Sequence, residues 1–185
     1  ELPAFAVSHF DAGAAAEYDW IHFEGRNIEQ TRTLLDAIRR ISPSVKVSVE
    51  LEKPRANIES LITYAQLVFY SRPYVTTQGF SEAQHFLQQQ HQQYSHAIHV
   101  VTWGEQGAYL IDQTGQLFHS TANQGLGRVV DTVAAGDTFN AGFIHAFVSG
   151  CSASAALESA CWLAGKKCTQ LGLQALPMQD DMDGW

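Results

Sequence analysis

The alternation of two kinds of segment along the chain constrains its fold more than any other feature. Apolar runs rich in β-branched residues predict buried strands, and segments with helical periodicity lie between them. The predicted strands are residues 20–25, 45–51, 66–71 and 96–104. Because parallel strands need crossover connections, this order predicts an α/β fold with a mostly parallel sheet and helices on both faces.

Capping signals locate the first helices. Asn27 can cap a helix after the first strand, with Gln30 as its reciprocal capping partner. Residues 55–64 predict a short helix, and Ser81 with Gln84 marks the start of another helix. These helices supply the crossover connections that a parallel sheet requires.

The carboxyl-terminal part of the chain has a different pattern. Residues 108–120 predict a hairpin that turns at Gly115. Phenylalanines at every fourth position from Phe139 predict a helix that ends at Gly150. A last helix is predicted over about residues 153–166. We therefore expect a hairpin followed by two helices.

Composition and charge limit the function classes. With 185 residues, 45% of them hydrophobic, the chain is expected to form one domain over residues 1–185. The net charge of −8 argues against nucleic-acid and anionic-membrane partners. No apolar run approaches about 18 residues and no secretory signal is visible. Three cysteines without paired spacing predict reduced thiols in a cytoplasmic protein.

Candidate site residues follow the predicted strands, because ligands of parallel α/β sheets bind beyond the carboxyl ends of the strands. They include the carboxylates Glu24, Glu50 and Glu52, each of which is more often a surface or ion-pairing residue. The whole set comprises residues 24–26, 50–53, 71–72, 103–107 and 131–137.

The stretch VVDTVAAGDTFNAGF, residues 129–143, carries the strongest chemical signal. Ala134, Ala135 and Gly136 are small enough to let backbone approach a ligand, and the first amides of the following helix favour an anion. Asp137 beside them could accept a proton from a hydroxyl group, since the helix start favours the ionised carboxylate. The alternative is that Asp137 only caps the helix, and spacing alone does not decide between the two.

The same stretch resembles a known family signature. DTVAAGDTFNAGF is similar to the sequence D-T-x-G-A-G-D-x-F near the carboxyl end of the ribokinase-like (PfkB) sugar kinases. WIHFEGRN, VSVELEKPR and LAGKKC resemble the ketohexokinase (fructokinase) branch of that family. Together these four segments extend the similarity over nearly the whole chain.

The resemblance implies a ribokinase-like three-layer αβα sandwich that transfers the γ-phosphoryl group of ATP to a sugar hydroxyl. Asp137 then matches the catalytic base, and Ala134, Ala135 and Gly136 match the anion hole. The implied ligands are ATP, Mg²⁺ and a small sugar such as fructose or a related ketose. Residues implied at the nucleotide are Gly104, Glu105, Gln106, Gly107, Arg26, Arg72 and Cys168.

Some of these assignments have alternatives or departures. Cys168 is equally compatible with a buried small hydrophobic residue. Ala134 replaces the first glycine of the signature, at a cost of about 1 kcal/mol if its φ is positive. The stretch SRPYV replaces a Lys-Asp pair, so Arg72 keeps a positive charge whereas Pro73 removes an acid and an amide donor. Magnesium ligands are therefore not assigned, and Glu24, Glu50 and Glu52 are the nearest spare carboxylates.

The family's sugar-binding residues, first strands and lid lie upstream of the motifs matched here, so we expect this chain to lack them. The enzyme hypothesis is an ATP-dependent sugar kinase of which this is the carboxyl-terminal portion. The alternative is a non-catalytic nucleotide-binding or regulatory module, and the presence of Asp137 favours the enzyme. The resemblance leaves open a homodimer of the full-length protein and a dependence on K⁺.

Overall fold

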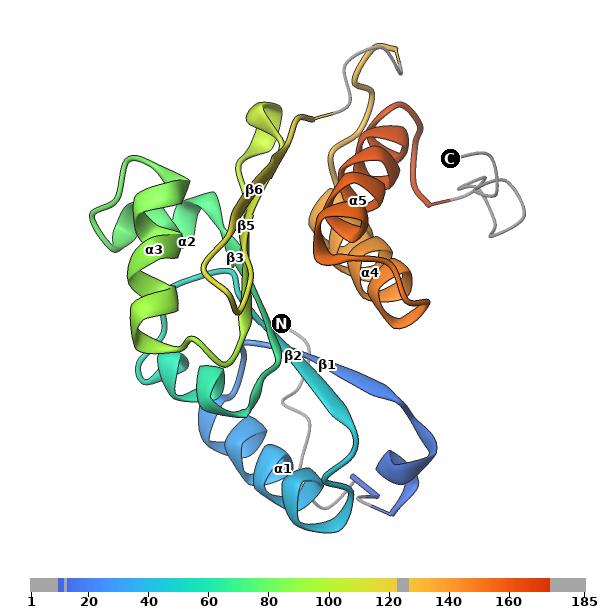
Figure 1. Cartoon of the computed structure of the whole chain (residues 1–185). Coiled ribbons are helices and arrows are strands. Elements are labelled where there is room, and N and C mark those ends of the chain that lie inside the picture. Colours follow the sequence, from blue (N-terminus) through green and yellow to red (C-terminus); the bar gives the residue numbers. More distant parts are fainter. Residues whose placement is uncertain (1–9, 12, 123–126, 174–185) are drawn as a thin grey trace. The chain divides into compact units, whose positions relative to one another are not determined.

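The computed structural model describes residues 10–11, 13–122 and 127–173. The chain divides into two compact units (Figure 1). The first comprises Glu1–Trp103 and Tyr109–Leu117, and the second comprises Gly104–Ala108 and Phe118–Trp185. Each unit is described by itself.

The strands form a sheet in the order in which they occur along the chain, from β1 to β6. Neighbouring strands from β1 to β4 are parallel, as the sequence predicts. Their carboxyl ends therefore lie at one edge of the sheet, and the α/β class is confirmed. The strands are β1 (Trp20–Glu24), β2 (Lys46–Leu51), β3 (Leu67–Ser71), β4 (Ile98–Thr102), β5 (Ala108–Ile111) and β6 (Leu117–Ser120).

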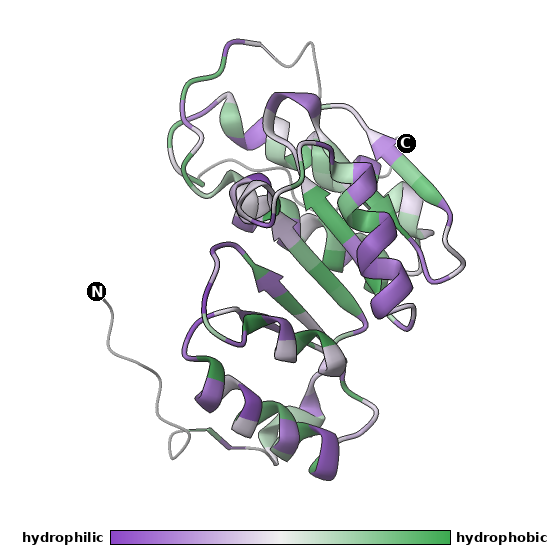
Figure 2. Cartoon of the chain, turned by 90° about the vertical axis from the view of Figure 1, so that its left-hand side faces the viewer, coloured by the Kyte–Doolittle hydropathy of each residue, from purple (hydrophilic) through white to green (hydrophobic). Residues whose placement is uncertain are grey.

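Helices of the first unit cover its strands (Figure 1). Hydrophobic residues dominate these strands, whereas the helices alternate hydrophobic and hydrophilic residues (Figure 2). The core includes Val49, Leu51 and Leu61, which are fully buried. The helical elements of this unit are η2 (Ala14–Glu17), α1 (Ile28–Ile41), η3 (Ile58–Tyr64), α2 (Arg72–Thr77) and α3 (Ala83–Gln93).

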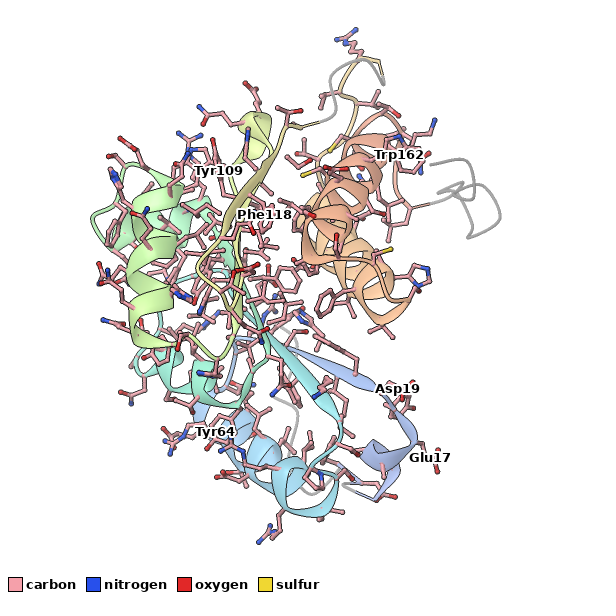
Figure 3. The ribbon with its side chains drawn as sticks, in the orientation of Figure 1. Glu17, Asp19, Tyr64, Tyr109, Phe118 and Trp162 are labelled. Atoms are coloured by element: carbon pink, nitrogen blue, oxygen red, sulfur yellow. The ribbon has the colours of Figure 1, made fainter. Side chains whose placement is uncertain are left out.

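Tyr64 joins two of these helical elements (Figure 3). Its hydroxyl donates to the Asp36 carboxylate at 2.9 Å. The Arg39 guanidinium lies over the Tyr64 ring, 4.8 Å from the ring centroid. Because Asp36 and Arg39 belong to α1 and Tyr64 ends η3, these contacts fix the helices that precede and follow β2.

The predicted reciprocal capping of α1 is wrong. Asn27 is the residue before α1, but its φ is 45° and its side chain makes no capping bond. The Gln30 Oε1 atom is buried without a hydrogen-bond partner among the described residues. The Thr31 hydroxyl instead donates to the Arg26 carbonyl at 2.8 Å. The left-handed backbone of Asn27 places its side chain outside the usual extended capping geometry.

Other helix starts also differ from the prediction. α3 begins after Glu82 rather than after Ser81. The segment predicted as a short helix over 55–64 is a 3₁₀ helix that begins at Ile58. The sequence did not predict α2, which directly follows β3. In α2, Pro73 lies in the first turn, where a missing amide costs no helical hydrogen bond, and the Ser71 hydroxyl caps the Tyr74 amide at 3.0 Å.

The second unit contains two long helices, α4 (Ala135–Val148) and α5 (Ala153–Cys168). They lie side by side (Figure 1). A Cβ atom on Gly142 would lie 3.0 Å from the Leu163 side chain and 3.5 Å from the Ala160 Cα atom, so glycine permits this close approach. Gly150, with a φ of 94°, follows α4 as predicted. The second unit also contains η4 (Gly104–Gln106).

A buried polar network crosses the core of the first unit. The His99 Nε2 atom lies 3.0 Å from the Tyr94 carbonyl, which can only accept, so Nε2 carries the proton. His99 Nδ1 therefore accepts from the Tyr70 hydroxyl at 3.0 Å. Burial lowers the pKa of His99 to about 4, although the bond to Tyr94 opposes this shift. The network needs a neutral imidazole.

Acidification should destabilise the protein through His99. An unfolded histidine binds a proton near pH 6.5, whereas folded His99 resists protonation until about pH 4. His99 therefore contributes fully to the free energy of unfolding above pH 6.5. Between pH 6.5 and about pH 4 that free energy falls by up to about 1.4 kcal/mol per pH unit. Urea unfolding at several pH values measures this slope. His99→Gln should flatten it and exposed His85→Gln should not; equal slopes for wild type and His99→Gln would contradict the assignment.

Candidate functional site

The start of α4 provides two backbone amides that precede the first i→i−4 bond of the helix. That first bond runs from the Thr138 amide to the Ala134 carbonyl at 2.9 Å. The Ala135 amide donates to the Thr132 carbonyl at 3.2 Å. The amides of Gly136 and Asp137 lie between these two donors, at the positive end of the helix dipole. This arrangement can bind an anion.

Ala134 has a left-handed conformation, with φ 60° and ψ 17°. Because this φ is positive, alanine at this position of the signature costs about 1 kcal/mol relative to glycine. The conformation reverses the chain direction immediately before α4 begins at Ala135. The turn into the helix is therefore strained, and other contacts must hold it.

Asp137 is the third residue of α4, and its side chain is exposed. Ala134, rather than Asp137, is the N-cap residue. Within the described ranges, the Asp137 carboxylate makes no hydrogen bond or ion pair. A Cβ atom on the neighbouring Gly136 would meet nothing within 4 Å among the described residues. The carboxylate is thus accessible to a ligand at the helix start.

The loop before α4 is bound to the end of α5. The Cys168 carbonyl accepts from the amides of Val130 at 2.8 Å and Asp131 at 3.2 Å. The Asp131 carboxylate accepts from the Lys167 ammonium at 2.7 Å and from the Val133 amide at 2.9 Å. Sequence analysis missed this role of Lys167, because the burial of a lysine at a helix end depends on its tertiary partner.

These contacts change the acidity of two side chains. The Lys167 ammonium, followed by the amides of Val133 and Gly172, lowers the pKa of Asp131 to about 2. Burial raises the pKa of the Cys168 thiol, so the neutral form is favoured at neutral pH. The three cysteines, Cys151, Cys161 and Cys168, are free thiols in the described structure.

The segment after β4 has a fixed backbone and exposed side chains. Gly104 and Gly107 have φ values of 61° and 88°, in the region that favours glycine. A Cβ atom on Gly107 would collide with the Ser120 carbonyl, so the backbone approaches this strand end closely. Glu105 and Gln106, which complete η4, are exposed. The structure thus places Gly104–Gln106 as a turn with accessible backbone.

Two predicted basic residues belong to the first unit. Arg26 forms an ion pair with Glu24 at 2.6 Å, and both side chains are about half exposed. The Arg72 guanidinium lies 5.3 Å from the ring centroid of Trp103. These residues follow the carboxyl ends of β1 and β3, as expected. Asp137 and the Gly104–Gly107 segment belong to the second unit, so their combination with Arg26 and Arg72 in one site stays a prediction.

The described residues contain no cluster of three or more His, Cys, Asp or Glu side chains placed to hold a metal ion. Glu24 is paired with Arg26, and Glu52 lies 3.6 Å from Lys53. Glu24 and Glu50 are register partners on the parallel strands β1 and β2. None of the helices among the described residues has the length and hydrophobicity needed to cross a membrane.

Comparison with known proteins identifies similar sequences. The profile described as pfkB family carbohydrate kinase matches residues 11–181. The chain is 36% identical to ketohexokinase of Mus musculus over 182 residues, which cover 95% of this chain and 61% of that relative. It therefore spans about three fifths of the relative's length.

Solved structures show a matching fold. A structure described as a putative ribokinase from Agrobacterium tumefaciens has a TM-score of 0.82 and 22% identity, over 94% of this chain and 57% of that one. Ribokinase of Arabidopsis thaliana, complexed with ribose and ATP, has a TM-score of 0.73 and 19% identity, over 88% and 53% of the two chains. These likenesses confirm the ribokinase-like α/β fold.

Replacing Ala134 by glycine should stabilise the protein, because it removes the left-handed strain and costs only the greater freedom of glycine in the unfolded chain. We expect a gain of roughly 0.5–1 kcal/mol in the free energy of unfolding. Ala135→Gly, one residue later and inside the helix, is the control and should destabilise by up to about 1 kcal/mol. Urea unfolding measures both; the same sign for the two variants would contradict this account.

Proposed function

Because the chain belongs to the pfkB family of carbohydrate kinases, we propose that the protein transfers the γ-phosphoryl group of ATP to a hydroxyl group of a small sugar. The 36% identity to a ketohexokinase favours fructose or a related ketose as the acceptor. Both compact units would then be parts of one kinase domain. A cytoplasmic location remains the expectation from the sequence, and the resemblance leaves open a homodimer of the full-length protein.

One observation carries the proposal: an exposed carboxylate lies in the first turn of α4, beside the amides that precede the first helical bond. In the proposed reaction, Asp137 accepts the proton of the sugar hydroxyl as its oxygen bonds to the γ-phosphorus atom and the bond to ADP breaks. Of the anion-hole residues Ala134, Ala135 and Gly136, Gly136 would donate its amide to the negative charge on the transferring group, because the Ala135 amide already donates to the Thr132 carbonyl. The small side chains of Ala134 and Ala135 would let that group approach. The base and the anion hole thus come from consecutive residues.

The nucleotide residues are proposed from position and chemistry. Gly104, Glu105, Gln106 and Gly107 would line the nucleotide with their turn, whose glycines permit close backbone approach. Cys168 would contact the adenine ring of ATP through a neutral thiol, consistent with its raised pKa.

Arg26 and Arg72 would approach the phosphates. The stacking of Arg72 on Trp103 restrains the guanidinium without neutralising it, which suits binding of an anion. Arg26 is already paired with Glu24, so its charge is partly compensated. We therefore expect Arg72 to contribute more than Arg26 to phosphate binding.

Mg²⁺ fits the donor chemistry at the ends of β1 and β2. Magnesium is usually bound by one or two carboxylates together with substrate phosphates, so a cluster of three protein ligands is not required. Glu24 and Glu50 are register partners on β1 and β2, and Glu52 lies just after the end of β2, so one or two of these carboxylates are the proposed oxygen donors. When bound, the ion would neutralise charge on the phosphates.

A non-catalytic nucleotide-binding or regulatory module is the second candidate. The accessible Asp137 favours the kinase, because a module without catalysis has no need of a base. An assay of sugar-dependent ADP release separates these candidates, because only the kinase would show turnover.

The role of Asp137 can be tested by Asp137→Asn in the full-length protein. The amide keeps the shape of the side chain but cannot accept the hydroxyl proton, so kcat should fall by about 10² or more. The KM for ATP should change little. Glu158→Gln, an exposed substitution on α5, is the control and should keep wild-type turnover. Wild-type turnover in Asp137→Asn would remove this residue from the mechanism.

The chain of residues 1–185 alone should not phosphorylate sugars at a useful rate. The proposed sugar contacts and lid lie upstream of the motifs matched here, and without a lid water reaches the transferring phosphoryl group. A coupled ADP-release assay with fructose should show activity only in a form extended upstream to the length of ketohexokinase. Equal sugar-dependent turnover by both forms would require a sugar site built wholly from this chain.

A further inference from the structure

We propose that Lys167 is a positioning residue: it acts through Asp131 to fix the loop of residues 129–134 and, with it, the amides at the start of α4. This inference rests on the proposed function, because the anion bound by those amides would be the transferring phosphoryl group. Lys167 itself would touch neither the sugar nor the nucleotide.

Hydrophobic packing cannot hold this loop. The exposed fractions of its three valines, Val129, Val130 and Val133, are 62%, 54% and 75%. Such residues lose little contact with water when the protein folds, so they contribute little to fixing the backbone. The loop must therefore be held by polar contacts.

Those polar contacts converge on Asp131. Its carboxylate accepts from the Lys167 ammonium at 2.7 Å, from the Val133 amide at 2.9 Å and from the Gly172 amide at 3.2 Å. The Lys167 ammonium also donates to the Asp131 backbone carbonyl at 3.0 Å. Lys167 thus binds both the side chain and the backbone of one loop residue, which fixes its orientation as well as its position.

Burial makes this contact hard to break. The Lys167 side chain is fully buried, whereas the Asp131 side chain keeps an exposed fraction of 18%. Moving Asp131 away would leave a buried ammonium without its carboxylate, which is strongly unfavourable. The loop therefore has one favoured position, as the strained conformation of Ala134 requires.

A fixed loop has a specific catalytic consequence. Amides that stabilise a transition state must lie within hydrogen-bond distance of the developing charge, and a small displacement reduces the rate steeply. Loosening the loop should therefore lower kcat more than it raises the KM for the sugar, because the sugar would be held elsewhere.

Lys167→Met in the full-length protein tests the proposal, with Lys166→Met as the matched control on the same helix. Lys167→Met should lower kcat by at least about tenfold and change the KM for fructose by less than about twofold. Lys166→Met should behave as wild type. Amide hydrogen exchange gives a readout independent of activity: the Val133 amide should exchange faster in Lys167→Met, while the Val100 and Val101 amides of β4 should not change.

Wild-type kcat in folded Lys167→Met would overturn the proposal, even if the variant were less stable, because a purely structural role predicts that result. Unchanged exchange at Val133 would also overturn it. If Lys167→Met does not fold, Asp131→Asn carries the same test, and full kcat in that variant would refute the role of the pair. If the wild-type protein has no Asp137-dependent turnover, the proposed function fails, whereas the exchange comparison still tests how Lys167 holds the loop.

Discussion

The buried ion pair between Lys167 and Asp131 fixes the segment on which the proposed chemistry depends. It joins the end of α5 to the loop before α4, across 36 residues of sequence. The pair lowers the pKa of Asp131 to about 2, so the carboxylate stays ionised further into the acid range than an ordinary aspartate does. Lys167 therefore stays buried only while the loop keeps its place. The position of the first turn of α4 is thus set by α5 as well as by the sequence of α4.

This constraint explains how a loop with exposed valines can end in a strained turn. Ala134 holds a left-handed conformation, and α4 begins one residue later, which leaves the Gly136 and Asp137 amides ahead of the first helical bond. An anion at these amides and a proton acceptor at the Asp137 carboxylate would be adjacent. Phosphoryl transfer depends mainly on such positioning and on charge stabilisation, which is why this short segment supports the assignment to a kinase.

The sequence predicted the features that depend on local pattern. Apolar runs located the parallel strands, and the small residues around Asp137 located the helix start. Features that depend on unusual backbone or tertiary contacts were missed: Asn27 has a positive φ and does not cap its helix, and α2, which carries Pro73 in its first turn, was not predicted. Lys167 looked like an ordinary charge at a helix end, because only its contact with a distant carboxylate shows that it is buried.

The central claim is that the start of α4 binds the transferring phosphoryl group beside its base. A crystal structure of the full-length protein with fructose and a non-hydrolysable ATP analogue tests it most directly. The account predicts a γ-phosphate oxygen within hydrogen-bond distance of the Gly136 or Asp137 amide. It also predicts that the Asp137 carboxylate lies about 2.6–3.2 Å from the acceptor hydroxyl. A γ-phosphate bound away from this helix start, or a sugar hydroxyl out of reach of Asp137, would contradict it.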